Sequence, residues 1–309
     1  MKITRCLMTI ALVASSVSIS SAHEPPGETF FAFQFPAHAV PTIDGDLGDW
    51  AMVPDIFEIT FENGDIQETV RGDAGSDLSD FNARSVWAWN EETNRIYSFA
   101  NVVDDWLTNG REDPTIFNYD DDWHFVVDAD HSGGDGFNGD WNDLGEDERR
   151  DLFFTTMQLW QIHVPPVDGF WAFVYIEATS WETTGRELPF PEFSQIGWSR
   201  TGETSGPGTY TYEIMMTPWE NWSWDGPGQS TIVDMQEGSI IHVGSLSKDY
   251  DEDTGSYQGS YDFPPVHDVW RNGNLMADME LLPVDTDLFP TAVEDDSWGR
   301  IKSHFLLKK

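Results

Sequence analysis

Cysteine is almost absent from this sequence: Cys6 is the single one in 309 residues, and it lies ahead of an apolar run at the N-terminus. With one thiol the chain cannot form an internal disulfide, and zinc sites built from thiolates are excluded. A large exported domain without disulfides needs another way to fasten its loops. Bound calcium is a common one.

Basic residues are also scarce, with 16 Lys and Arg against 55 Asp and Glu and a formal net charge of -39 at pH 7. Such a charge repels phosphates, which disfavours nucleic acids and anionic membranes as partners and leaves neutral polymers and divalent cations. The 15 tryptophans and an aromatic content of 14% argue against disorder.

Long apolar runs are missing after the N-terminus. Residues 1–22 combine the basic Lys2 and Arg5, the apolar stretch Leu7–Val17 and the small residues Ser20–Ala22, the pattern of a signal peptide cleaved before His23. The apolar stretch is too short to span a bilayer. We therefore predict a secreted, periplasmic or cell-surface protein that has no membrane contact after cleavage.

Short strand-like segments separated by Gly, Asn, Asp and Pro make up most of the chain. Such a pattern predicts an all-β protein, specifically an antiparallel β-sandwich of the immunoglobulin or jelly-roll type. Helical periodicity is weak, with one turn expected at Glu146–Arg150. The predicted strands are Arg84–Trp89, Arg95–Val103, Trp123–Asp128, Leu152–Ile162, Phe170–Glu177, Thr209–Met216, Ser239–Leu246 and Asp278–Leu282.

Proline and charge suggest the domain boundaries. Residues 23–41 are rich in Pro and Phe and are expected to be irregular, residues 42–283 to form one sandwich domain, and residues 284–309 to form a linker and a short tail. The tail collects four of the 16 basic residues. It is either a docking element for a partner or a frayed terminus.

Two Asp-rich loops follow predicted strands. Alternating oxygen donors with glycine at the bend suit a hard cation, so we predict structural calcium; the alternative is a solvated acidic turn. The first loop carries Asp128, Asp130, Ser132 and Asp135, and the second carries Asp249, Asp251 and Asp253.

Several short motifs occur in a characteristic order. They are Ile43–Trp50, Val86–Asn90, Asp121–Asp128, Tyr210–Ile214 with Pro218–Trp219, and Trp270–Asn272. In order and spacing the chain resembles the family 9 carbohydrate-binding modules and their DOMON-related relatives, over roughly residues 40–283. The resemblance implies a non-catalytic β-sandwich with structural calcium. Its aromatic side chains would stack on an oligo- or polysaccharide, in polysaccharide recognition or breakdown.

The same resemblance implies ligand-binding residues. Trp270 falls at a stacking position with Arg271 beside it, and the second aromatic wall would be Tyr119 or Trp106. Histidines stand where the family has a carboxylate and two amides, and imidazole hydrogen-bonds hydroxyls less flexibly than an amide. These histidines are His124, His242 and His267.

Other functions fit parts of the sequence. Paired carboxylates could hydrolyse glycosides, and His23, terminal after cleavage, could bind copper with a second histidine, as in copper-dependent polysaccharide oxidases. The three histidines above could bind a transition metal, and methionines with histidines could ligate haem. Carboxylate pairs arise by chance among 55 acids, and methionine at strand spacing is more often core. A binding module without an organic cofactor is therefore preferred.

Overall fold

The computed structural model describes residues 23–70, 77–109, 120–136, 143–174, 180–202, 206–251 and 257–285. Within these ranges, no helix is long and apolar enough to cross a membrane. The strands are β1 (Phe30–Gln34), β2 (Ile59–Thr60), β3 (Gln67–Glu68), β4 (Phe81–Asn90), β5 (Arg95–Asp104), β6 (Trp123–Asp128), β7 (Gln158–Val167), β8 (Phe170–Val174), β9 (Ser194–Gly202), β10 (Gly208–Met216), β11 (Trp219–Asn221), β12 (Thr231–Ile232), β13 (Ile240–Tyr250), β14 (Tyr257–Phe263) and β15 (Ala277–Val284). The helices are α1 (Glu146–Phe154) and the 3-10 helices η1 (Ala37–Ala39), η2 (Leu47–Met52), η3 (Asp55–Phe57), η5 (Pro227–Gln229), η6 (Val269–Arg271) and η7 (Gly273–Leu275).

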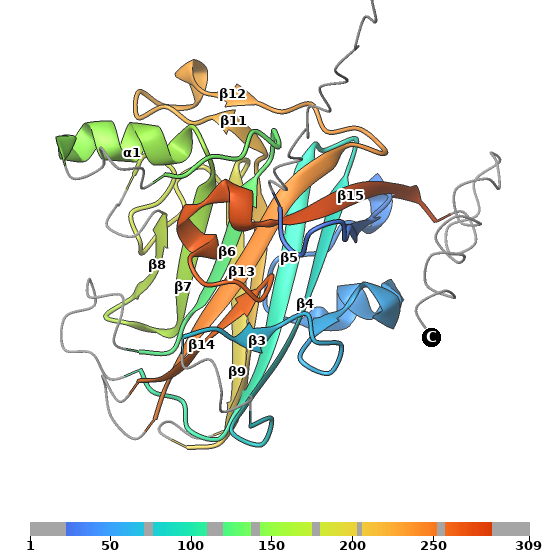
Figure 1. Ribbon diagram of the computed structural model, residues 1–309, viewed down its shortest axis with the longest axis vertical. Coiled ribbons are helices and arrows are strands. Elements are labelled where there is room, and N and C mark those ends of the chain that lie inside the picture. Colours follow the sequence, from blue (N-terminus) through green and yellow to red (C-terminus); the bar gives the residue numbers. More distant parts are fainter. Residues whose placement is uncertain are drawn as a thin grey trace, which may run out of the picture.

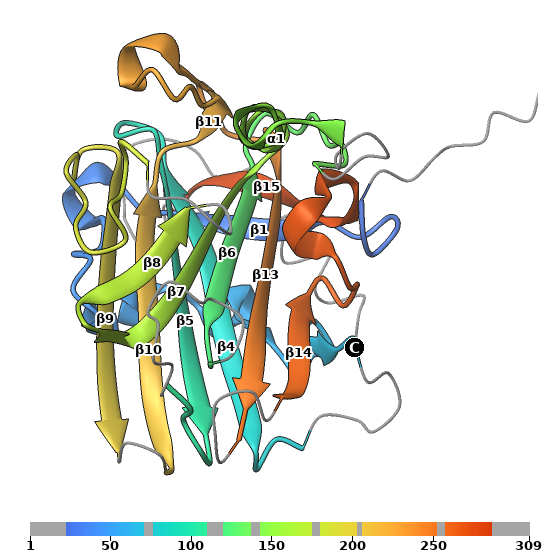
Figure 2. The same cartoon turned by 90° about the vertical axis from the view of Figure 1, so that its left-hand side faces the viewer.

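Most strands belong to one sheet that curls until its two halves face each other (Figure 2). One half runs β8-β7-β6-β13 with β14 beside β13, the other runs β4-β5-β10-β9, and β15 and β1 join them. Helix α1 and the β11–β12 pair lie at one end of this body (Figure 1). The prediction of an all-β sandwich is confirmed. The sheet is mixed rather than wholly antiparallel, because β1 pairs parallel to both β15 and β4.

The main core lies between the two halves. The ring centroid of Trp87 on β4 lies 5.9 Å from that of Phe125 on β6, and Trp123 on β6 lies 6.4 Å from Tyr212 on β10. All four side chains are buried. Aromatic rings at these separations pack favourably, and they hold the two layers face to face.

A second core covers the outer face of β1, β4 and β5. The 3-10 helices η2 and η3 bring Trp50 and Phe57 onto this face, where Trp50 packs against Phe35 at 5.2 Å and Phe99 at 4.8 Å. Strand β1 is therefore covered on both sides. Residues 23–41, which we expected to be irregular, contain this central strand.

A buried carboxylate joins the N-terminal motif to β10. Glu213 accepts hydrogen bonds from the backbone N–H groups of Asp44 (3.0 Å) and Gly45 (2.9 Å) and from Nε1 of Trp50 (2.7 Å). Gly45 has a φ of +84°, and a Cβ there would lie 2.2 Å from the carbonyl carbon of Trp198. Two sequence motifs more than 160 residues apart thus form one structural unit.

The predicted strand Leu152–Ile162 is wrong in its first part. Helix α1 runs to Phe154, and β7 begins only at Gln158. The helix is the predicted turn at Glu146–Arg150 extended to nine residues. The side chain of Glu148 accepts a hydrogen bond from the backbone N–H of Gly145 at 2.8 Å, which stabilises the first turn.

Candidate functional site

The 3-10 helix η6, which carries Trp270 and Arg271, packs on β13 at Gly244. A Cβ on Gly244 would lie 2.5 Å from Cγ2 of the buried Val269, so only glycine lets the helix sit this close. Alternate residues of a strand share a face. His242, Gly244 and Lys248 therefore lie on the same face of β13. Because η6 packs on this face at Gly244, it lies between the side chains of His242 and Lys248.

Replacing Gly244 with alanine is expected to lower the free energy of unfolding by about 1–3 kcal/mol, because the added methyl group overlaps Val269. Chemical denaturation measures the loss. Gly228→Ala is the matched control, since a Cβ there meets no atom within 4 Å. Equal stability of the two variants would show that η6 is not held against β13 in this way.

The loop after β6 fastens the far side of η6. The backbone N–H of Gly136 donates to the carbonyl of Arg271 at 3.0 Å, and that of Gly273 donates to Gly134 at 2.8 Å. Asp135 forms an isolated bridge with Asn272. The Asp-rich loop thus supports the segment that carries Trp270.

Inside this loop the carboxylates bond backbone groups. Asp128 accepts from the N–H of Gly133 at 2.7 Å and of Ser132 at 3.3 Å, and Asp130 accepts from that of Ser132 at 3.1 Å. In the described part of the chain, Asp128, Asp130 and Asp135 do not converge as a cation site. Calcium in this loop stays a prediction.

A polar cluster lies on the Lys248 side of η6, around Asp122. Its Oδ2 lies 2.9 Å from Nε2 of His124 and 3.7 Å from Nζ of Lys248, and it accepts from Nε2 of Gln161 at 2.6 Å. Burial raises the pKa of Asp122, but the positive charges of His124 and Lys248 outweigh it and hold that pKa below its ordinary value. Burial also lowers the pKa of His124, which favours its neutral form. Lys248 is therefore the main positive charge beside Asp122.

A second group of charged side chains leads from β14 to Trp270. Asp262, buried opposite Leu246, lies 3.8 Å from Nδ1 of His267, whose Nε2 lies 3.5 Å from Asp268. Asp268 pairs with Arg271, whose Cζ lies 5.8 Å from the centre of the Trp270 ring. The nearby carboxylate of Asp262 raises the pKa of His267. A series of ion pairs therefore leads from Asp262 to Arg271, which neighbours the half-buried Trp270.

The structure brings together some of the predicted ligand residues and separates others. Trp270, Arg271 and His267 are neighbours, and His267 is 52% exposed on its side chain. His124 is 3% exposed and is therefore not at the surface beside Trp270. His242 lies on the other side of η6, four residues along β13 from Leu246, which pairs with His124. Trp106 follows the end of β5, and Tyr119 lies outside the described residues.

A separate group of carboxylates gathers where β5 and β13 end and β6 begins. Ligand oxygens of the buried Asp104, Asp121 and Asp249 lie within 4.8 Å of one another, and those of Asp80, Asp105 and Asp251 form a second such set. Burial, then the charge of Asp104, raise the pKa of Asp249 to about 8. Oδ1 of Asp249 is buried without a hydrogen-bond partner.

We call these six aspartates the acidic cluster. Asp249 and Asp251 were predicted as metal ligands, whereas the other four were missed, and Asp253 lies outside the described residues. The sequence signal that could have identified these four aspartates is an Asp close to the end of each of several predicted strands. All-oxygen donors that repel one another, three of them buried, suit a hard cation such as calcium.

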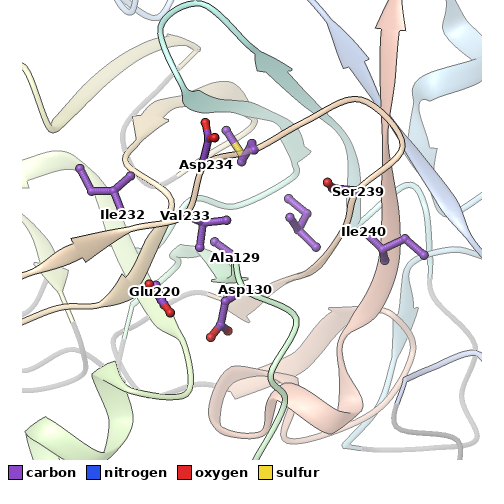
Figure 3. Close-up of a pocket in the computed structure, with 10 residues that line it drawn as sticks. Ala129, Asp130, Glu220, Ile232, Val233, Asp234, Ser239 and Ile240 are labelled. Atoms are coloured by element: carbon purple, nitrogen blue, oxygen red, sulfur yellow. The ribbon is translucent and has the colours of Figure 1, made fainter.

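A pocket of about 330 Å³ lies elsewhere, between the loop after β6 and the start of β13 (Figure 3). Asp130 is the one predicted site residue that lines it, with Glu220 and Asp234 as further acids. The other lining side chains are aliphatic or small, with Met235 among them, and none is aromatic. A sugar would find no ring to stack on there.

No family model matches the sequence, and no curated protein sequence matches it. Among solved structures, the chain is similar to a carbohydrate-binding module of family 9 from Caldicellulosiruptor kristjanssonii in complex with cellotriose. The identity is 13%, the match covers 87% of this chain and 98% of that one, and the TM-score is 0.48. For a family 9 module from the same organism in complex with glucose, the identity is 13%, the coverage 84% and 98%, and the TM-score 0.47.

Proposed function

We propose that this is an exported, non-catalytic carbohydrate-binding protein whose sugar site lies at Trp270. The observation that carries the proposal is the half-buried Trp270 ring beside Arg271 and His267, both oriented by acidic partners. An aromatic face next to convergent polar groups is the usual design of a saccharide site. The sequence motifs around Ile43–Trp50 and Trp270–Asn272 support the same function.

Each group has a distinct task in the proposed site. The Trp270 face stacks on the apolar face of a pyranose ring, and Arg271 and His267 donate hydrogen bonds to hydroxyls. Asp268 and the buried Asp262 hold these donors in place. His124 is a positioning residue here, since it contacts Asp122 behind Lys248.

Calcium fits the acidic cluster. Asp104, Asp121 and Asp249 would hold one ion, with Asp80, Asp105 and Asp251 next to it. The ion would neutralise carboxylates that burial otherwise penalises and would fix the loops at the ends of β5 and β13. Its role in the proposed function is structural, in a protein that recognises an oligo- or polysaccharide during its capture or breakdown.

Trp270→Ala is expected to weaken carbohydrate binding by more than tenfold, because stacking and burial of an aromatic ring together contribute about 2 kcal/mol. A glycan array identifies the ligand, and affinity electrophoresis on that polysaccharide measures the loss. Trp171→Ala is the matched control, a half-buried tryptophan on β8 whose Nε1 donates to the carbonyl of Arg186. If no glycan in a broad array binds, or if both variants weaken binding equally, the proposal fails.

A further inference from the structure

Three histidines and two aspartates gather on the other side of η6. His242 on β13 lies opposite both Asp128 on β6 and Asp278 on β15, because these residues are paired in the sheet. Nε2 of His242 lies 3.2 Å from Oδ1 of Asp278, Nε2 of His131 lies 3.0 Å from the same oxygen, and Nδ1 of His23 lies 3.2 Å from Oδ2. We call this group the histidine cluster.

The chain holds each histidine there by its backbone. The N–H of Glu24 donates to the carbonyl of Met276 at 3.0 Å, which places His23 beside β15. His131 has a φ of +57°, a left-handed conformation that is uncommon for a residue with a Cβ, and its ring centroid lies 3.8 Å from that of His242. Strand pairing fixes His242 and Asp278.

His242 is oriented as histidine ligands of metals usually are. Its Nδ1 lies 2.9 Å from Oδ2 of Asp128, an oxygen that also accepts from the N–H of Gly133. In the neutral imidazole, the carboxylate of Asp128 holds the proton on Nδ1, and Nε2 then carries a lone pair. Nε2 is buried without a hydrogen-bond partner and faces Asp278. An imidazole whose one ring nitrogen is hydrogen-bonded to a carboxylate, and whose other nitrogen has no hydrogen bond, has the arrangement that supports metal binding.

The separations also suit one ion. Ligand atoms at about 2.0–2.1 Å from a tetrahedral metal lie roughly 3.3 Å from each other. Oδ1 of Asp278 lies 3.0 Å from His131 and 3.2 Å from His242, and Oδ2 lies 3.2 Å from His23. Ligand atoms of His23, His242 and Asp278 all lie within 4.8 Å of one another, and His131 adds a fourth nitrogen beside Oδ1. The side chains of His23 and His131 are 26% and 38% exposed, so an ion can enter from solvent.

We propose that His23, His131, His242 and Asp278 bind one divalent transition-metal ion, with Asp128 orienting His242. Imidazole nitrogens with one carboxylate favour Cu²⁺ and Zn²⁺ over calcium, and Cu²⁺ is expected to bind more tightly than Zn²⁺. The site is distinct from the acidic cluster, whose donors are all oxygens. It shares no residue with the proposed sugar site at Trp270, Arg271 and His267.

Metal titration tests this proposal. The purified protein is freed of metals, supplied with excess calcium to fill oxygen-only sites, and titrated with CuCl₂ or ZnCl₂ in a calorimeter. We expect one ion per chain and, for Cu²⁺, nitrogen hyperfine splitting in the electron paramagnetic resonance spectrum. His23→Ala and His131→Ala should each weaken binding at least tenfold, and Asp128→Asn should weaken it about 10–100-fold.

His38→Ala is the control, an exposed histidine in η1 that should leave the affinity unchanged. His23 and His131 carry the test because both are partly exposed, whereas His242→Ala removes a buried side chain and could prevent folding. The proposal is overturned if the three variants His23→Ala, His131→Ala and His38→Ala bind both metals as the unmodified protein does. A copper spectrum with oxygen ligands alone would overturn it too.

Discussion

Replacing Glu213 with alanine is expected to lower the free energy of unfolding by about 3–5 kcal/mol. The substitution leaves three donors without their acceptor: the N–H groups of Asp44 and Gly45 and the indole N–H of Trp50. Each unsatisfied buried donor costs about 1–3 kcal/mol, and the missing side chain leaves a cavity. Urea denaturation, followed by tryptophan fluorescence, measures the change.

Glu213→Gln should lie between the unmodified protein and the alanine variant. The amide keeps one oxygen that can accept from Trp50, but its NH₂ group faces the donors of Asp44 and Gly45. Glu220→Ala is the control: Glu220 is exposed on β11, and its loss should change stability by no more than about 0.5 kcal/mol. If the Glu213 and Glu220 variants are equally stable, Glu213 does not fasten the N-terminal motif to β10.

Much of the fold was predictable because most strands are runs rich in apolar and aromatic residues, bounded by turn-forming residues. The alternation in Thr209–Met216 and the apolar run Trp123–Asp128 correspond to β10 (Gly208–Met216) and β6 (Trp123–Asp128). Strand β1 was missed because its five residues lie in a proline-rich segment, with Pro25, Pro26 and Pro36 around it. Its parallel pairing depends on contacts with β4 and β15 that no local pattern reveals.

The candidate sites were less predictable, since each collects residues from separate strands. Trp270, Arg271 and His267 are near in sequence and were predicted together. The histidine cluster depends on the pairing of β6, β13 and β15, which places Asp128, His242 and Asp278 side by side. The resemblance put His242 at a sugar-binding position, and the spacing within one strand could not reveal that Asp128 and Asp278 flank it.

Removing divalent cations is expected to destabilise the protein most strongly at high pH, through the acidic cluster. The pKa of Asp249 rises from 3.8 to about 8, first because of burial and then because of neighbouring carboxylates. The folded, cation-free protein therefore binds this proton more tightly than the unfolded chain, and its stability falls as the pH rises from about 4 to about 8. At about 1.4 kcal/mol per pH unit, the loss reaches at most about 6 kcal/mol.

Calcium should abolish this loss, because a bound cation replaces the proton as the partner of the ionised carboxylates. We expect the melting temperature at pH 8 to be about 5–10 °C lower in chelator than in calcium, with a much smaller difference at pH 5. Differential scanning calorimetry at both pH values measures it. Equal melting temperatures in chelator and calcium at pH 8 would contradict calcium binding at the acidic cluster.

The Asp249→Asn variant distinguishes ion binding from simple charge repulsion, because it should raise the melting temperature in chelator and lower it in calcium. In chelator at pH 8 the variant should melt above the unmodified protein, since it removes a buried negative charge next to Asp104 and Asp121. In calcium it should melt below it, since one ligand of the ion is gone. Asp234→Asn, at an exposed position beside the start of β13 and so at the opposite end of that strand from Asp249, should follow the unmodified protein in both media. A variant that is more stable in both media would mean that the aspartates only repel one another and hold no ion.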